Sequence, residues 1–505
     1  MFENLILGLD VATMPVNLGM ALIGAAIGTA IGVLPGLGPV ATISILMPVT
    51  FQLAPASAII MLCGIYLGAM YGGSITSILV NVPGESASVV TCLDGHQMAK
   101  NGRAGAALGI AAFGSFIGGI LATIGLLLLA PAIPQLTRGF GPPEYAMLVL
   151  AGLLLVTQVG TSGTIRSLIM AFAGLMLATV GTDPISGEQR FTFGFTFLYD
   201  GIGIVPLAIG LFGVAELLSL ALGRNETQKL QYEKLKVREL LPSRAEWRRS
   251  APAIGRGSVI GFLLGLLPGA GMSLVSFVAY TIEKALSRRS AEFGRGAIEG
   301  VAGPETANNA GSQAAFAPML TLGLPSSPTM GVIMGALMIH GVAVGPQLIT
   351  RNPDVFWGVI ASMLISNLIL IVLNVPLISI FVRLLKVPSS LLVPLIMLFV
   401  VVGAYTIDNQ IEDVWMTLLF GVVGFLLRRC GFDPAPMVLA YVLGGIFERS
   451  LRQSLILGDG VGIFLERPVS AVLMLVCVAM VLVVLVRTIL RFRSGAALVQ
   501  EADQT

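Results

Sequence analysis

The sequence predicts an all-α polytopic membrane protein, and three observations carry that prediction. Only 11% of the 505 residues are charged, whereas soluble domains carry about 25%. Hydrophobic residues make up 55% of the chain, which is more apolar surface than a soluble fold of this size can bury. The 61 glycines and 27 prolines are typical of closely packed and broken membrane helices.

The composition also argues against several function classes. The net charge of +2 gives no bias towards nucleic acid, and the chain has no Walker A motif for hydrolysing ATP itself. The two histidines lack metal-ligand spacing, and the four cysteines form neither a metal-spaced pair nor a disulfide framework. We therefore interpret the chain as a transporter or channel rather than an enzyme.

Apolar stretches are assigned as membrane segments where they approach the length that crosses the hydrocarbon core. Because a span needs about 20 apolar residues, the sequence predicts roughly 11–14 membrane segments. The clear candidates are 106–131, 145–158, 163–182, 204–222, 355–376, 388–405, 411–428 and 468–486. The weaker or broken candidates are 16–34, 40–53, 56–70, 252–267, 272–285 and 434–447.

Lysine and arginine in the connections predict the orientation, because they gather on the cytoplasmic side. The hydrophilic segment 224–256 holds nine of them, so we place it in the cytoplasm. Threading outward from this segment puts 23 of the 29 basic residues on the same side. The segments assigned to the opposite side hold acidic residues: Asp183, Glu188, Asp200, Asp408, Glu412 and Asp413.

A glycine ladder occurs twice in the chain. The first is Gly24, Gly28, Gly32 and Gly36, ending in GVLPGLGP (32–39), and the second is Gly257, Gly261, Gly265 and Gly269, ending in GLLPGAGM (265–272). Helix packing alone explains one such ladder, but two with the same ending indicate an internal repeat. We predict a first membrane repeat over 1–222, a basic cytoplasmic linker over 223–256 and a second, inverted membrane repeat over 257–505.

Each repeat contains two broken segments, 24–53 and 71–93 in the first and 257–285 and 298–330 in the second. In each repeat the later segment is an apolar stretch punctured by Gly, Pro, Asn and Ser. Non-helical backbone is tolerated at membrane depth only inside the protein or beside a wet cavity. Paired broken helices in an inverted repeat therefore predict a transport site. The tips of PGLGP (35–39) and PGAG (268–271) should approach each other near the bilayer midplane, and the re-entrant tips around Pro83–Ser86 and Pro304–Asn309 should border the same cavity.

The residue types at these breaks suit a cation bound together with an organic anion. Proline removes a backbone donor and glycine permits the turn that follows, so PGLGP (35–39) and PGAG (268–271) should open the helix. Opened backbone offers carbonyl groups to a cation and N–H groups to a carboxylate. We expect helix N-termini, hydroxyls and amides to hold the anion, because no lysine or arginine lies within 32–39, 71–86, 265–272 or 303–327.

Glu85 and Glu305 are the acidic residues within 71–86 and 303–327, and an ionisable side chain in a membrane segment is a functional candidate. Either could bind a proton, or hold Na⁺ with amide oxygens of Asn81, Asn308 and Asn309. Alternatively, each caps a re-entrant helix near the interface. The predicted substrate- or ion-binding residues are Pro35, Gly36, Gly38, Ser74, Asn81, Pro83, Gly84, Glu85, Ser86, Pro268, Gly269, Gly271, Pro304, Glu305, Thr306, Asn308, Asn309, Pro325, Ser326 and Ser327. We predict no catalytic residue and no cofactor beyond the coupling ion, Na⁺ or H⁺.

Five long motifs run through the chain. They are GVLPGLGPVATISILMP (32–48), GIYLGAMYGGSITSILVNVPGESASVVTCLDGHQMAKNGRAGAALG (64–109), LLPGAGMSLVSF (266–277), IEGVAGPETANNAGSQAAFAPMLTLGLPSS (298–327) and LRQSLILGDG (451–460). Together they resemble the large membrane subunit of the tripartite tricarboxylate transporters. The resemblance implies a multi-pass secondary transporter of the bacterial inner membrane, importing citrate or another carboxylate on an ion gradient. It also implies two partners, a periplasmic solute-binding protein and a small membrane subunit.

Two other function classes remain open at this point. A passive channel or pore for small organic anions would use the same broken helices to line a conduit. Flux faster than a conformational cycle, which takes microseconds to milliseconds or longer, would favour the channel. A membrane enzyme acting on lipid-linked substrates would need an acid, base or metal constellation that the sequence lacks.

Overall fold

The computed structural model describes residues 2–34, 37–132, 139–159, 163–183, 185–222, 237–267, 269, 271–385, 387–406 and 409–483. Over these ranges the chain is helical almost throughout, and its strands form one two-stranded hairpin. The predicted all-α fold is confirmed. Its cause is the apolar composition, because backbone N–H and C=O groups in lipid must pair within their own segment.

Apolar helices long enough to cross a membrane confirm a multi-pass membrane protein. Among the described residues five helices qualify by length and composition: Pro15–Gly32, Pro55–Val80, Ala104–Leu129, Ile204–Leu222 and Pro353–Asn374. Shorter apolar helices cover Pro39–Gln52, Pro142–Leu155, Thr164–Ala178, Pro328–Ile339, Ser390–Tyr405 and Pro468–Val483. The five longer helices coincide with predicted stretches, although the one that begins at Pro55 runs further than predicted.

The chain divides into two compact units, and each unit contains parts of both halves of the chain. Unit 1 comprises Met1–Thr137 and Gly203–Arg429, and unit 2 comprises Arg138–Ile202 and Cys430–Thr505. These bounds record which segments pack together, whereas the predicted repeats, 1–222 and 257–505, concern internal resemblance within the chain. The repeat boundaries therefore stay a prediction.

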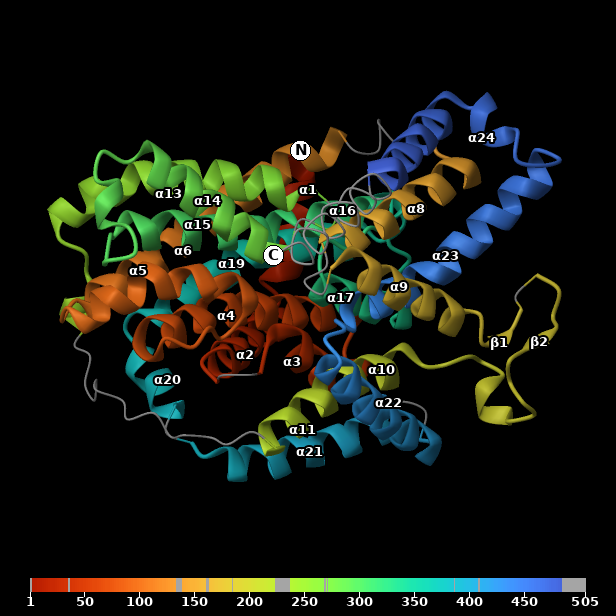
Figure 1. Ribbon diagram of the computed structural model, residues 1–505, viewed down its shortest axis with the longest axis horizontal. Helices are drawn as coiled ribbons and strands as arrows, with labels where there is room; N and C mark the ends of the chain where they lie inside the picture. The colour runs from red at the N-terminus through yellow and green to blue at the C-terminus, as the bar shows by residue number, and fades with distance from the viewer. Residues whose placement is uncertain are drawn as a thin grey trace, which may run out of the picture. The chain divides into compact units, whose positions relative to one another are not determined.

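Unit 1 holds most of the helices (Figure 1). From the first half of the chain come α1 (Phe2–Ala12), α2 (Pro15–Gly32), α3 (Pro39–Leu46), α4 (Pro55–Val80), α5 (Val89–Lys100), α6 (Ala104–Leu129), α10 (Ile204–Ala208) and α11 (Ala215–Leu222), the last two joined by a π-helical segment, Ile209–Val214. From the second half come α12 (Val237–Leu240), α13 (Arg244–Gly265), α14 (Met272–Leu286), α15 (Glu299–Ala314), α16 (Phe316–Leu322), α17 (Pro328–Ile339), α18 (Leu348–Arg351), α19 (Pro353–Asn374), α20 (Ile378–Leu384), α21 (Ser389–Tyr405) and α22 (Ile411–Arg429).

Unit 2 contains α8 (Pro142–Val159), α9 (Thr164–Ala178), α23 (Ala435–Leu457), α24 (Ile463–Glu466) and the apolar helix Pro468–Val483. Strands β1 (Gly181–Thr182) and β2 (Gln189–Arg190) form the hairpin after α9. Near the start of α9, Arg166 donates to the Gly431 carbonyl at 3.0 Å. Beyond its end, Asp183 accepts from Arg452 at 2.7 Å. Helices α9 and α23 therefore run side by side in the same direction.

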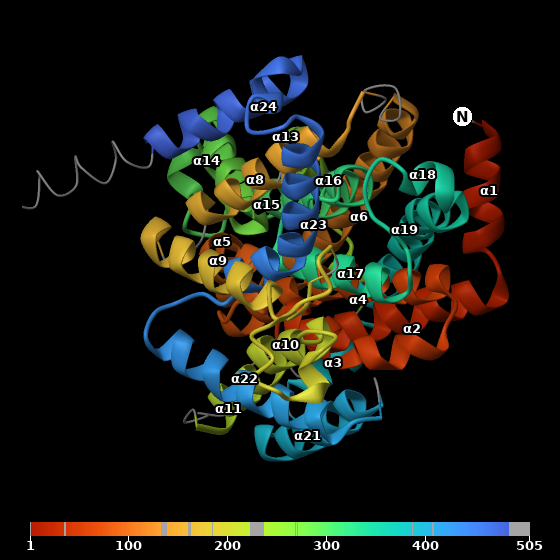
Figure 2. The same cartoon turned by 90° about the vertical axis from the view of Figure 1, so that its right-hand side faces the viewer.

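Both glycine ladders serve close packing of helices, in pairs that lie side by side in Figures 1 and 2. The closest contacts pair Gly24 with Met61, Gly28 with Ile65 and Gly32 with Ala69 across α2 and α4, and Gly257 with Gly303, Gly261 with Ala307 and Gly265 with Gly311 across α13 and α15. A Cβ atom on Gly32 would lie 2.6 Å from the Ala69 carbonyl oxygen, and one on Gly257 would lie 2.5 Å from that of Gly303. Only glycine permits these approaches of backbone to backbone.

Helix packing in unit 1 is reciprocal between the two halves of the chain. Helix α2 packs against α4 and α19, and α13 packs against α15 and α6. Likewise α6 packs against α15 and α19 packs against α4. Exchanging α2, α4 and α6 for α13, α15 and α19 therefore maps each of these contacts onto another of them, as a twofold-related pair of repeats would require. The contact of α4 with α6 has no counterpart of similar extent between α15 and α19.

The later helices of the two halves also pack reciprocally, because in each case two consecutive helices of one half pack against a helical segment of the other half. In unit 2, the consecutive helices α8 and α9 pack against α23, which comes from the other half of the chain. In unit 1, the consecutive helices α21 and α22 pack against α10–α11, again from the other half. Each of these two groups therefore combines two consecutive helices of one half with a helical segment of the other half.

One predicted break is wrong, and the structure places it elsewhere. Residues Pro304 to Asn309 lie inside α15, where no helix break occurs. An interior proline costs a helix about 3 kcal/mol, but α15 packs against α13, α6 and α14, and this packing holds it helical. The break in this region comes later, at Gly323, where the backbone is left-handed with φ of 70°.

The breaks of the two halves have the same layout. Helix α4 ends at Val80, and Asn81 is left-handed with φ of 59°, as is Gly323 after α16. A proline follows two residues later in each half, and two residues further on a side chain caps the next helical turn. These capping residues are Glu85, which accepts from Ala87 N at 2.9 Å, and Ser327, which accepts from Met330 N at 3.3 Å.

Part of the predicted cytoplasmic linker is helical. Its residues 223–236 lie outside the described part of the chain, and α12 and the first turns of α13 occupy most of the remainder. Ser243 and Glu246 cap α13 reciprocally, since each side chain accepts a hydrogen bond from the other residue's backbone N–H. The linker boundary predicted at residue 256 therefore falls inside a helix.

The ladder contacts predict that valine destabilises the protein far more at one glycine of α13 than at another. We expect Gly261→Val to destabilise the protein by more than the 1–3 kcal/mol that ordinary overpacking costs, because its Cβ would lie 2.8 Å from Ala307 Cα. Gly255→Val is the matched control on the same helix, since nothing lies within 4 Å of its Cβ position. The measurement is the melting temperature and the yield of monodisperse protein in detergent. Equal stability of the two variants would contradict the packing role.

Candidate functional site

Helix α15 is buried along its whole length although it is strongly polar. All 16 of its residues are buried. Glu305, Asn309 and Gln313 recur every fourth residue and so share one face, while Gly303, Ala307 and Gly311 present the opposite face to α13. Because buried polar groups without partners cost free energy, the polar face must find its hydrogen bonds on neighbouring helices.

Glu305 finds two of its partners in the first half of the chain. The Ser74 hydroxyl of α4 donates to Glu305 Oε2 at 2.6 Å, and the Thr91 hydroxyl of α5 donates to Oε1. Glu305 is only 1% exposed. Two hydroxyls from one half of the chain therefore hold a buried carboxylate from the other half.

Glu85 reaches the same helix from the break after α4. Asn308 Nδ2 donates to Glu85 Oε1 at 3.2 Å, and the other carboxylate oxygen caps the turn 86–88. The side chain is buried, and its partner Asn308 lies three residues after Glu305 on α15. Glu85 is thus both a cap, as the alternative interpretation expected, and a member of a buried polar network.

Glycines let this break fold back onto α4. A Cβ atom on Gly84 would lie 2.6 Å from Gly73 Cα and 2.9 Å from the Thr76 hydroxyl oxygen. A Cβ atom on Gly73 would in turn lie 2.9 Å from the Glu85 side chain. Gly84 therefore acts by permitting the close approach that brings Glu85 to α15.

A layer of amides and hydroxyls continues the network along α15. Asn309 Nδ2 donates to Ser115 Oγ of α6 at 2.7 Å. Gln313 and Asn367 of α19 exchange two hydrogen bonds, of 3.1 and 3.0 Å, and the Thr123 hydroxyl of α6 donates to Gln313. The network thus joins α4, α5, α6 and α19 to α15.

Several buried polar atoms in and around this network have no hydrogen-bond partner among the described residues. They are Asn308 Oδ1, Asn309 Oδ1, Ser326 Oγ and the Tyr66 hydroxyl. Tyr66 lies on α4, which ends at the first break, and its ring centroid is 6.2 Å from that of Phe316 on α16, which ends at the second break. Because buried polar groups almost always have partners, unpaired acceptors and hydroxyls gathered in one region can hold a ligand.

A small cavity borders the network. It has a volume of about 10 Å³, and Tyr71, Ser74 and Ser115 contribute polar atoms to its lining. Ser74 and Ser115 are the partners of Glu305 and Asn309. The volume corresponds to a single water or a small cation and is far below that of an organic carboxylate.

Comparison with known proteins places the chain in a family. The sequence model of the family described as "Tripartite tricarboxylate transporter TctA family" matches residues 18–439. The chain belongs to the TctA family. The matched range runs from the first turn of α2 to the start of α23 and includes every residue of the buried network.

Two relatives of this TctA-family chain come from Agrobacterium vitis. One is described as "Uncharacterized 52.8 kDa protein in TAR-I ttuC' 3'region" and is 45% identical over 492 residues, 97% of each chain. The other, "Uncharacterized protein in TAR-II ttuC' 3'region", is 47% identical over 232 residues, which are 45% of this chain and 96% of the relative. No solved structure matches. Family membership and the apolar helices together establish a multi-pass membrane subunit of a tricarboxylate transporter family.

The structure brings only part of the predicted site together. Ser74, Glu85, Glu305, Asn308 and Asn309 meet in the buried network. Asn81 and Ser86 are exposed, and Thr306 donates to the Ala302 carbonyl of its own helix. Three of the predicted residues lie outside the described part of the chain: Pro35, Gly36 and Pro268. Gly38, Pro83 and Pro304 have backbone roles, and Gly269 and Gly271 have φ of 80° and 28°. Pro325, Ser326 and Ser327 form the second break.

The predicted approach of the PGLGP and PGAG tips rests largely on residues outside the described ranges. The helices that follow these tips are described. Helix α3 packs against α17, and α14 packs against the turn 86–88 and α5. Each of them therefore borders the helix that follows the later break of the other half.

Sequence reasoning missed Tyr66, Thr91, Ser115, Thr123, Gln313 and Asn367. Thr91 and Gln313 lie within predicted broken segments, but hydroxyls and amides are common there. Ser115, Thr123 and Asn367 lie in α6 and α19, two of the most apolar helices. A search for every polar residue within an apolar span would have found them.

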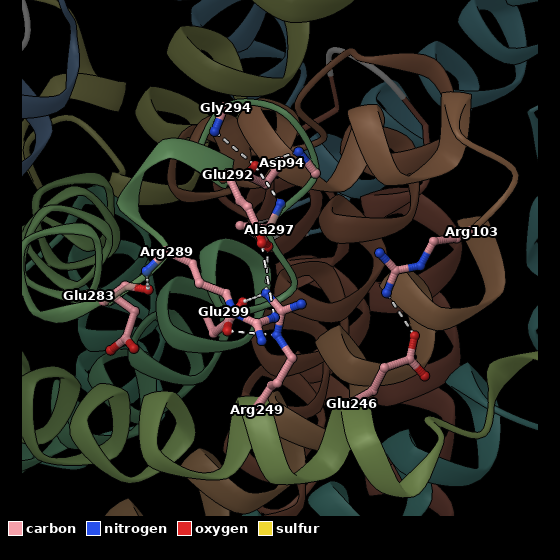
Figure 3. Close-up of polar contacts among 12 residues, drawn as sticks. Asp94, Arg103, Glu246, Arg249, Glu283, Arg289, Glu292, Gly294, Ala297 and Glu299 are labelled. Atoms are coloured by element: carbon pink, nitrogen blue, oxygen red, sulfur yellow. Dashed lines mark hydrogen bonds and ion pairs between the residues drawn. The ribbon is translucent and has the colours of Figure 1, made fainter.

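A second polar cluster in unit 1 joins segments that the charge pattern assigns to the cytoplasm (Figure 3). The backbone N–H groups of Gly294, Gly296 and Ala297 all donate to Asp94 Oδ1 at 2.8 Å. The Tyr280 hydroxyl donates to the other oxygen at 2.9 Å. Fully buried Asp94 thus ties α5 of the first half to the loop before α15.

Ion pairs surround this tie. Arg103 pairs with Glu246 at 2.8 Å, and Arg249 pairs with both Glu292 and Glu299 at 2.7 Å. The Arg249 guanidinium holds the pKa of Glu292 below its usual range. All these residues come from segments predicted to lie on one side of the membrane, and the structure gathers them together.

The Asp94 tie predicts local protection of the loop. In Asp94→Ala, the amides of Gly294, Gly296 and Ala297 should exchange at least about tenfold faster, because hydrogen bonds to a charged group contribute about 1.5–3 kcal/mol. Hydrogen exchange measured by mass spectrometry reports these amides. Lys100→Ala, on the exposed side of the same helix, is the matched control and should leave exchange unchanged. Unchanged protection in Asp94→Ala would contradict the role of this carboxylate.

Proposed function

We propose that this chain is the permease subunit through which a tripartite system of the bacterial inner membrane imports an organic carboxylate, a tricarboxylate or a related acid. A gradient of Na⁺ or H⁺ drives the uptake. The observation that supports the proposal is the meeting of Glu85 and Glu305, from opposite halves of the chain, in one buried polar network.

The residues around Glu305 have the chemistry of a cation site. Glu305 offers a carboxylate, and Asn308 and Asn309 offer amide oxygens without hydrogen-bond partners. Hard cations such as Na⁺ take oxygen ligands of these kinds, and a buried carboxylate is equally suited to carry a proton. The neighbouring cavity of about 10 Å³ has room for one ion or water molecule.

The anion is assigned to the second break. Helix α17 begins there, and the N–H groups at a helix N-terminus favour negative charge. The unpaired hydroxyls of Ser326 and Tyr66 add donors. The buried polar residues that the structure describes include no lysine or arginine, so the co-transported cation would supply the compensating positive charge.

The partners follow from the family. A tripartite transporter has further subunits, and we assign a periplasmic solute-binding protein and a small membrane subunit to this chain. The binding protein delivers the carboxylate to the side predicted to be outside. Since the described packing leaves no room for it near Glu305, binding requires the helix breaks of the two halves to separate.

Reconstitution tests the coupling. Proteoliposomes containing both membrane subunits and the loaded binding protein should accumulate a labelled carboxylate, citrate being the first to test, only under an inward Na⁺ or H⁺ gradient. Collapsing each gradient in turn with a selective ionophore identifies the coupling ion. Equilibration without accumulation, insensitive to both ionophores, would identify a passive channel instead.

Glu305→Gln tests the site. This variant keeps the size of the side chain but removes its charge, so gradient-driven accumulation should fall at least about tenfold, a change of roughly 1.4 kcal/mol. Glu292→Gln is the matched control, because Glu292 is an exposed glutamate of the same unit and should transport normally. The melting temperature of both variants shows whether they fold. A folded Glu305→Gln protein with normal coupled transport would remove Glu305 from the mechanism.

A further inference from the structure

Three phenylalanines of unit 2 stand exposed on the segment that follows β2. Phe191, Phe193 and Phe195 are 52%, 81% and 56% exposed, while Thr192 between them is buried at 5%. The side chains therefore alternate, with the aromatic ones directed outward. Large apolar side chains grouped at the surface mark a contact with another apolar phase or molecule.

The backbone here is held in an unfavourable conformation. Phe191 and Phe193 have φ of 54° and 49°, in the left-handed region that bulky residues rarely adopt. A hydrogen bond from Phe195 N to Thr192 O at 2.9 Å closes the turn. Strain of this kind persists only where the surrounding structure enforces it, and it accompanies functional contacts.

Ion pairs fix the base of this segment. Arg190 donates to Glu448 of α23 at 2.6 and 3.3 Å, and Arg452 donates to Asp183 at 2.7 Å. The hydrogen bond from Thr182 N to Tyr199 O, at 2.8 Å, closes the far end. The three phenylalanines are therefore presented on a rigid support.

The chemistry of the segment favours lipid over protein as the occupant. Residues 191–199, FTFGFTFLY, contain no charged side chain, whereas a protein-docking patch usually has a polar and charged rim. The segment lies in the chain between two predicted spans, with only residues 196–203 separating Phe195 from Ile204. In interfacial membrane segments, phenylalanine and leucine side chains bury into the boundary between headgroups and acyl chains.

Helix α9, which precedes this segment in unit 2, also carries a stripe of exposed apolar side chains. Its exposed members, Ile165, Leu168, Ile169, Phe172 and Met176, share one helix face by their spacing. On a membrane helix of a multi-pass protein such a stripe faces the acyl chains. The hairpin that carries the phenylalanines begins three residues after α9 ends.

We propose that Phe191, Phe193 and Phe195 form a membrane anchor, with their rings inserted between the headgroups and acyl chains of the leaflet at the end of α9. The anchor fixes the depth of unit 2 in the bilayer. It needs no partner subunit, and it does not depend on which ion or carboxylate the transporter uses.

Site-directed spin labelling in lipid nanodiscs tests the anchor. Cys92→Ser and Cys430→Ser remove the accessible native thiols, since Cys63 and Cys477 are buried. A nitroxide is then attached at Phe193→Cys, a position so exposed that the substitution removes few contacts. Power saturation compares accessibility to oxygen, which partitions into lipid, with accessibility to a nickel complex, which stays in water.

Two matched positions in unit 2 calibrate the result. Leu168→Cys, on the stripe of α9, gives the value for lipid, and Glu188→Cys, on the exposed hairpin, gives the value for water. In nanodiscs that contain the full chain without any partner subunit, the label at position 193 should have the accessibility ratio measured for lipid. A value equal to that of position 188 would overturn the anchor.

A label shielded from both reagents would also overturn the proposal, because it would show protein covering the segment. A second label at Phe195→Cys repeats the test independently and should give the same depth class. Lipid exposure at one position with water exposure at the other would likewise exclude the insertion of all three rings.

Discussion

The structure depends on burying a polar helix. Every residue of α15 is buried, although it carries two carboxylates and three side-chain amides. In a low-dielectric interior each of these groups must be paired, because an unpaired one costs several times what a hydrogen bond contributes. The positions of Ser74, Thr91, Ser115 and Asn367 follow from this requirement, since each supplies a hydrogen bond to one face of α15.

The glycine ladders meet the same requirement from the other side. Helix α15 can direct its polar face inward only if its opposite face is fully covered, and Gly257, Gly261 and Gly265 of α13 provide that cover through direct backbone contact. Helix α2 does the same for α4, which carries Ser74. Helices α4 and α15, which carry polar residues of the network, are therefore each covered on their other face by a closely packed helix. This shared need to cover a polar helix is a physical reason for the reciprocal packing of the two halves.

Sequence reasoning predicted the fold class and the longer spans, because these depend on composition and local pattern, and it selected Glu85 and Glu305 as candidate site residues of the broken segments. It failed at Pro304, where a local helix-breaking rule was outweighed by packing on several sides. It also failed to find Ser115, Thr123 and Asn367. Their importance comes from the helix that packs against them, and one sequence read locally does not contain that information.

The ladders also limit how the molecule can move. Where Gly28 lies on Ile65 and Gly261 lies on Ala307, the partner carbonyl occupies the space of a missing Cβ atom. A small slide of one helix would drive that carbonyl against a neighbouring side chain, so the next equivalent fit is one glycine spacing away, about 6 Å for four residues. Each of the pairs α2–α4 and α13–α15 therefore behaves as a rigid rod of two helices. Gradual shear is confined to interfaces formed by side chains.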